Sequence, residues 1–192
     1  MLIDHDIELK NAILDLPRNE KDKLLLKLIS KNSVLMNQLH FKLLEQEVDM
    51  EYRIKHAKKL IDNIFEQIDR ERLSIRNYSA KNLLKALRSA SGIINEHFLI
   101  TKDNYSEIGL RLYLLQESFR RYGKNFMQKE MSSNSKLLAY KAKRIDYILK
   151  KYYKIHEDFQ LDYRDDLNKV IEYAFISAIK PYAEELRLPL EV

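Results

Sequence analysis

The sequence predicts an all-α protein, and two observations support that fold class. Glycine and proline occur only three times each in 192 residues, always singly. Strands, hairpins and long loops need these residues at special backbone angles, so their scarcity favours helices joined by short polar turns. Apolar residues also recur at steps of three and four nearly from end to end, which is the spacing of one helix face. We favour a multi-helix bundle with a long central helix at about 47–76. An irregular α-solenoid of helical hairpins is the alternative, although the chain has no repeat of fixed length.

The first part of the chain predicts three short helices, at about 5–15, 18–31 and 33–46. Pro17 fixes a backbone angle that suits helix entry, and Ser33 is the expected N-cap of the third helix. We interpret residues 1–192 as a single all-helical domain in which 1–46 are the candidate N-terminal helical subdomain.

A long amphipathic helix is predicted at about 47–76. At about 1.5 Å per residue it would be roughly 45 Å long, enough to cross a compact chain of this size as its spine. Glu71 interrupts the apolar spacing once. The residues of this apolar seam are Met50, Ile54, Ala57, Ile61, Ile64, Ile68 and Ile75.

Two further amphipathic helices are predicted at about 79–100 and 105–123, with Ser79 and Asn104 at their starts. The predicted helices at 47–76 and 105–123 each carry a heptad-like apolar seam. We interpret both seams as inner edges of an intramolecular bundle. Pairing with a second chain as a coiled coil is the alternative. His97, beside Phe98, is interpreted as a partly buried packing residue.

The segment Met131–Ser135 is the most loop-like stretch and the predicted hinge. After it the sequence predicts helices at about 135–155 and 165–186. Pro181 interrupts the second, where we expect a kink or a fresh helical turn.

Composition and motifs exclude several classes of protein. The absence of cysteine excludes disulfides, thiolate zinc sites and cysteine nucleophiles. No stretch is apolar enough for a membrane span, and the acidic N-terminus does not resemble a signal peptide, so we expect a cytoplasmic protein that does not enter a membrane. No His has Glu three residues before it, and the string from His156 to Gln160 lacks the second His of a zinc protease. Gly92, Gly109 and Gly123 are too far apart for a phosphate-binding loop.

The sequence thus predicts no cofactor, no metal and no catalytic residue. The acidic group after His156 lacks the glycine and the spacing of a calcium loop, so we interpret it as helix capping or surface charge. Its members are Glu157, Asp158, Asp162, Asp165 and Asp166.

Charge is distributed unevenly along the chain. Lysine and arginine outnumber aspartate and glutamate by 12 to 3 in residues 111–154, whereas the acidic residues lead by 9 to 4 in 155–192. On the helix at 135–155, cations share one face with two tyrosines. A basic stripe with aromatic residues can follow a phosphate backbone and stack on unpaired bases. The predicted nucleic-acid-binding residues are Arg120, Arg121, Lys124, Tyr140, Lys143, Arg144, Tyr147, Lys150, Lys151 and Lys154.

The leading functional hypothesis is a non-enzymatic helical binding or scaffold protein. Its partner would be another protein or a second copy of the chain, through the long helix or through the C-terminal half that holds ten of the 12 tyrosines. The alternative is a protein that binds single-stranded nucleic acid or another polyanion through the basic stripe, unless the acidic segment after Glu157 neutralises that stripe.

Overall fold

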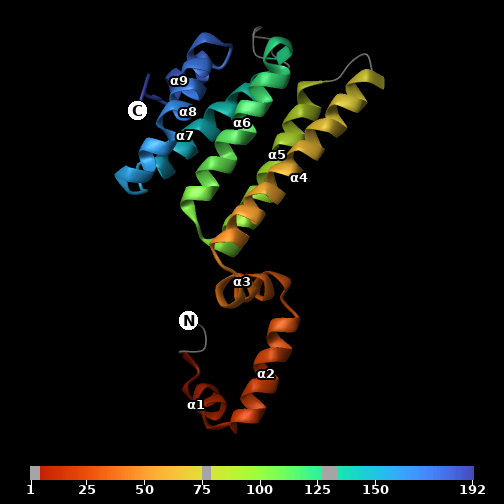
Figure 1. Ribbon diagram of the computed structural model, residues 1–192, viewed down its shortest axis with the longest axis vertical. Helices are drawn as coiled ribbons and strands as arrows, with labels where there is room; N and C mark the ends of the chain where they lie inside the picture. The colour runs from red at the N-terminus through yellow and green to blue at the C-terminus, as the bar shows by residue number, and fades with distance from the viewer. Residues whose placement is uncertain (1–4, 75–78, 127–133) are drawn as a thin grey trace. The chain divides into compact units, whose positions relative to one another are not determined.

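The computed structural model describes residues 5–74, 79–126 and 134–192, which form helices and turns with no strand (Figure 1). The all-α prediction is therefore confirmed. The chain consists of two compact units, which we call the N-terminal unit (Met1–Glu45) and the C-terminal unit (Gln46–Val192). This division lies beside the predicted subdomain boundary at residue 46. None of the described helices is both long enough and apolar enough to cross a membrane.

The N-terminal unit contains α1 (Ile7–Asp15), α2 (Arg18–Ser30) and α3 (Ser33–Leu44). Capping sets two of the helix starts. Asp6 accepts the amide N–H of Leu9 at 3.0 Å, and Asn32 accepts that of Leu35 at 3.0 Å. The prediction that Ser33 caps the third helix is thus wrong: the amide oxygen of Asn32 takes the cap position one residue earlier, and asparagine is at least as good an N-cap as serine.

The C-terminal unit is a helical bundle, as predicted (Figure 1). It consists of α4 (Glu47–Ser74), α5 (Ala80–Thr101), α6 (Asn104–Phe126), α7 (Ser135–Tyr152), α8 (Glu157–Ile176) and α9 (Lys180–Glu185). The predicted long helix is present as α4. Helix α6 contacts α4, α5, α7 and α8, and α7 contacts α5, α6, α8 and α9. Part of the predicted hinge, Met131–Ser133, lies outside the described residues.

Helix α6 takes part in both hydrophobic cores of the bundle. Leu110, Leu114 and Tyr122 pack with α4 and α5, whereas Ile108 and Leu112 pack with α7, α8 and α9. A helix with one apolar stripe packs on one side only. A helix with two apolar sides, such as α6, must have other helices packed against both of those sides. Helix α6 therefore joins the two halves of the bundle, and α7 adds Leu137 to the core of α4 and α5.

The start of α8 differs from the prediction. We expected a helix only from residue 165, but α8 begins at Glu157. The ring of His156 accepts the amide N–H of Asp158 at 3.3 Å, and the carboxylates of Glu157 and Asp158 stand in the first turn, where the helix dipole favours negative charge. Pro181 lies in the first turn of α9, where its missing N–H costs no hydrogen bond, so the expected fresh helical turn is confirmed.

Candidate functional site

The predicted basic stripe lies on α7 and is only one side of a larger arrangement. Helices α5 and α7 run parallel: Tyr140 contacts the backbone carbonyl of Leu87, and Lys151 contacts Phe98, each pair being 53 residues apart. Both helices are antiparallel to α6, which precedes α7 and follows α5. The parallel pairing brings one row of side chains from α5 next to the stripe of α7.

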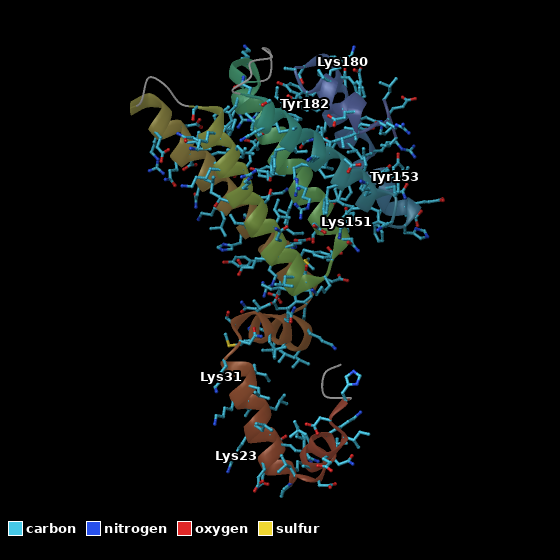
Figure 2. The ribbon with its side chains drawn as sticks, turned by 180° about the vertical axis from the view of Figure 1, so that it is seen from behind. Lys23, Lys31, Lys151, Tyr153, Lys180 and Tyr182 are labelled. Atoms are coloured by element: carbon cyan, nitrogen blue, oxygen red, sulfur yellow. The ribbon has the colours of Figure 1, made fainter. Side chains whose placement is uncertain are left out.

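Cations and aromatic rings alternate along the line where α5 meets α7. The Arg88 guanidinium lies 5.9 Å from the Tyr140 ring, and that of Arg144 lies 5.0 Å from the same ring and 5.7 Å from Tyr147. Further along, the Lys151 ammonium lies 5.8 Å from Tyr147 and 4.0 Å from Phe98. We call this row the α5–α7 seam: Arg88 and Phe98 of α5 and its C-cap residue Lys102, with Tyr140, Arg144, Tyr147 and Lys151 of α7. Figure 2 labels Lys151 near the end of α7.

The two tyrosines of the seam are fixed by their hydroxyl groups. The Tyr140 hydroxyl lies 2.7 Å from the Ser91 hydroxyl, and the Tyr147 hydroxyl donates to Glu107 at 3.0 Å. Both side chains are half-buried, and neighbouring guanidinium groups lie over their rings. The rings therefore hold cations in place, and stacking on bases would require the guanidinium groups to leave.

A buried ion-pair network lies under the seam. Glu107 of α6 is 1 % exposed and lies 2.9 Å from the ammonium of Lys151 and 2.7 Å from the guanidinium of Arg111, which also donates to Asn95 at 2.8 Å. Burial by itself raises the pKa of Glu107, but hydrogen bonds and charge from Lys151 and Arg111 outweigh burial and hold that pKa below its ordinary value. Glu107 is thus a carboxylate that anchors two cations of the bundle.

Lys141 is a buried basic residue on α7. Its side chain is completely buried, its ammonium lies 4.9 Å from the Phe119 ring, and it has no hydrogen-bond partner in the described part of the chain. Burial lowers the pKa of Lys141 to about 7. The sequence did not single out Lys141, Glu107 or Arg111, although Lys141 stands on the apolar side of α7 between Leu138 and Ile145.

The predicted site residues on α6 separate from those on α7. The Arg121 guanidinium faces α4, with Asp69 at 3.0 Å and Asp62 at 3.8 Å, and Arg120 pairs with Glu117 at 2.6 Å. Lys124 is exposed near the end of α6. The structure therefore does not bring Arg121 to the basic stripe of α7.

The remaining predicted residues lie on the outer side of α7. Lys143, Lys150 and Lys154 are exposed, and Lys150 pairs with Asp146 at 2.6 Å. Within the described residues, no ion pair joins α7 to α8, so the acidic segment that begins at Glu157 does not pair with the cations of the stripe. Arg88 and Phe98 were missed because only the fold places α5 beside α7.

A second surface with a distinct composition lies in the N-terminal unit. None of the residues of α1, α2 and α3 is buried. We call its ten exposed large apolar side chains the N-terminal apolar surface. They are Ile7, Leu9, Leu14, Leu24, Leu25, Leu26, Leu28, Met36, Leu43 and Leu44, with exposed fractions from 37 % to 70 %.

The described residues contain no group of three or more histidine, aspartate or glutamate side chains placed to hold a metal ion. No known protein family, curated protein or solved structure matches this chain. The two surfaces, rather than a relative, are therefore the basis for a functional proposal.

Proposed function

We propose that this chain is a non-enzymatic helical scaffold that associates with a second copy of itself through the N-terminal apolar surface. The observation that carries the proposal is the complete lack of buried residues in three consecutive helices that are rich in leucine. The C-terminal unit contains all the buried apolar residues of the described chain, whereas the same kind of residue stays in contact with solvent in the N-terminal unit. Exposed apolar surface of this extent is typical of protein interfaces.

The spacing of these residues supports an interface on helix faces. Ile7 and Leu14 of α1 are seven residues apart, as are Met36 and Leu43 of α3, so each pair lies on one face of its helix. A standard protein interface buries about 800 Å² per partner, and these side chains, each 37–70 % exposed, contribute apolar area toward it.

Charge favours a second copy as the partner. Helix α1 and its cap carry three carboxylates and one lysine, a net charge of −2, whereas α2 carries four cations and two carboxylates, a net charge of +2. In a dimer with two-fold symmetry, α1 of each copy can face α2 of the other with opposite sign. The surface is thus complementary to itself in charge as well as in hydrophobicity.

The test is the molar mass of the full chain by light scattering over a range of concentrations. We expect twice the 23.0 kDa of one chain at micromolar concentration. The double variant Leu25→Asp/Leu28→Asp should be monomeric, because two carboxylates would have to be buried at the interface. The control Asn11→Asp/Asn19→Asp adds the same charge at exposed polar positions of α1 and α2 and should remain dimeric.

Folding of the variants is checked by circular dichroism. Because the replaced leucines are exposed, both double variants should retain the helical signal of the parent chain. A parent chain that is monomeric at every concentration would contradict the proposal, and so would a dimer that survives both leucine substitutions.

A further inference from the structure

We propose that the α5–α7 seam, together with the lysines at its start, binds the phosphate backbone of a nucleic acid without reading its bases. This goes beyond self-association and rests on a different part of the chain. Four observations on the described residues support it: the shape of the row, the absence of neutralising carboxylates, a hollow at one end, and rings that are already covered.

The seam is a straight row of cations. Arg88, Arg144 and Lys151 follow one another along two parallel helices, and Lys102 continues the row beyond Phe98. From residue 81 to residue 102 the row extends about 30 Å at 1.5 Å per residue. Sites that follow a nucleic-acid backbone commonly span 4–16 nucleotides, and a row of this length can contact several nucleotides.

Carboxylates do not cancel this charge. Among the described residues, Glu107 is the only carboxylate that pairs with the seam; it is buried below the seam and pairs with Lys151 and Arg111. On the outer side of α7, Asp146 pairs with Lys150, which leaves Lys143 and Lys154 exposed without an ion pair in the described chain. A surface on which cations outnumber carboxylates attracts phosphates and releases their counterions.

The seam opens into a hollow of about 570 Å³ between the starts of α5 and α7. Its residues include Lys81, Arg88 and Lys136, and none of the described residues that line it is acidic. Lys81 and Lys136 are both exposed. Ligand sites commonly have volumes of 300–1,000 Å³, so the hollow can admit a phosphate with its sugar. The row of cations thus begins at a concave end that carries positive charge.

The aromatic rings determine the mode of recognition. Because guanidinium groups lie over Tyr140 and Tyr147, the rings are not free to stack on bases, and binding must depend on phosphates. This modifies the stacking mode that the sequence suggested for these two tyrosines. The expected ligand is RNA or DNA of any sequence.

The experiment is fluorescence anisotropy of the full chain with two labelled 20-nucleotide DNA strands, oligo(dT) and a mixed sequence, from 50 to 300 mM salt. We expect both strands to bind with equal affinity, which falls at least tenfold over this range because each phosphate contact releases counterions. A strong preference for one strand would show base recognition and overturn the proposal, and so would the absence of binding at 50 mM salt.

A matched pair of variants locates the site. Arg88→Glu/Lys136→Glu/Lys143→Glu reverses three cations on or beside the seam, and Lys55→Glu/Lys59→Glu/Arg164→Glu reverses three exposed cations on α4 and α8. Both variants have the same net charge. The seam variant should lose at least tenfold in affinity and show a shallower salt dependence, while the control stays within threefold. Equal losses in both would show attraction by net charge alone and overturn the proposal. All six positions are exposed, so both variants should keep the parent's circular dichroism spectrum.

Discussion

The Lys151 ammonium on α7 and the Glu107 carboxylate on α6 form an ion pair of 2.9 Å, although Glu107 is 1 % exposed and Lys151 is 20 % exposed. Because Arg111 contacts the same carboxylate, one negative charge is shared by two cations. The pair joins α6 to α7 below the seam. The pair therefore holds Lys151, a cation of the seam, in place. We expect removal of the Glu107 carboxylate to lower the stability of the bundle more than it changes the exposed seam.

The first prediction concerns this carboxylate. Glu107→Gln leaves the charges of Lys151 and Arg111 without a counter-charge in a buried place, which should lower the free energy of unfolding by about 2 kcal/mol. The control Asp146→Asn breaks the pair with Lys150, whose side chain is 70 % exposed, and should cost less than about 0.5 kcal/mol. Urea unfolding followed by circular dichroism measures both, and equal costs would contradict the anchoring role of Glu107.

The same carboxylate predicts a pH dependence. The pKa of Glu107 in the folded chain lies below its ordinary value of 4.5. Its ion pairs therefore contribute stability above pH 4.5, and this contribution is lost as pH falls below that value, because protonation becomes coupled to unfolding. Unfolding measured from pH 7 down to pH 3 should show a smaller loss of stability for Glu107→Gln than for the parent chain. Parallel curves would contradict the prediction.

Lys141 should respond to pH in another range. Its folded pKa of about 7 lies well below the 10.5 of an unfolded lysine, so between these values the unfolded chain binds the extra proton. Stability should therefore rise with pH above about 7. Lys141→Met, which has a similar volume and no charge, should raise the free energy of unfolding by about 2 kcal/mol at pH 7.

Measurements from pH 6 to pH 9 distinguish the effect of the buried Lys141 charge from a simple change in packing. The difference in stability between Lys141→Met and the parent should be largest near pH 6 and should shrink toward pH 9, where the folded lysine is already neutral. A difference that does not vary with pH would show that packing, rather than the buried charge, is responsible. Urea unfolding at each pH provides the measurement.

Gly92 and Gly123 predict opposite effects of the same substitution. A methyl group on Gly92 of α5 would meet no atom within 4 Å, so Gly92→Ala should stabilise the chain by about 1 kcal/mol through helix propensity. A methyl group on Gly123 of α6 would collide with the Tyr173 hydroxyl, and Tyr173 stacks on Phe119 at 4.3 Å. Displacing that ring should cost about 1–2 kcal/mol in Gly123→Ala.

A second substitution tests the cause of that loss. The hydroxyl of Tyr173 is the nearest atom to the added methyl group, so Tyr173→Phe should restore most of the stability when it is combined with Gly123→Ala. Melting temperatures of the two single variants and the double variant form a cycle that measures the coupling. Additive effects would mean that the loss has another origin.

The helices were predictable because helix formation depends on local spacing. Most predicted bounds agree with the structure within a few residues, since the apolar steps of three and four follow from 3.6 residues per turn. The register was less certain in α4: the predicted seam contains Ile64, whereas Phe65 is the residue that is fully buried. Neighbouring residues of a helix point only 100° apart around its axis, so both can lie within a broad apolar stripe. Tertiary packing then determines which of the two is buried.

The candidate site was only partly predictable. The basic face of α7 could be found because its cations follow helical spacing in one short segment. Arg88 and Phe98 could not be found in this way. Their position beside α7 depends on the turns before and after α6, which separates α5 from α7 in the sequence. Glu107 and Lys141 could not be predicted as buried either, because charged residues are rarely buried and their environment is set by residues distant in sequence.

The parallel pairing of α5 with α7 has a consequence for the order of events when the chain is synthesised. Contacts between successive helices close short loops, whereas the seam joins residues 53 positions apart. Arg88 and Phe98 emerge first and lack their neighbours on α7 until the chain has been extended beyond residue 151. A chain that stops before α7 would retain the cations of α5 without the row to which they belong. The complete row of cations therefore forms only after α7 has been synthesised.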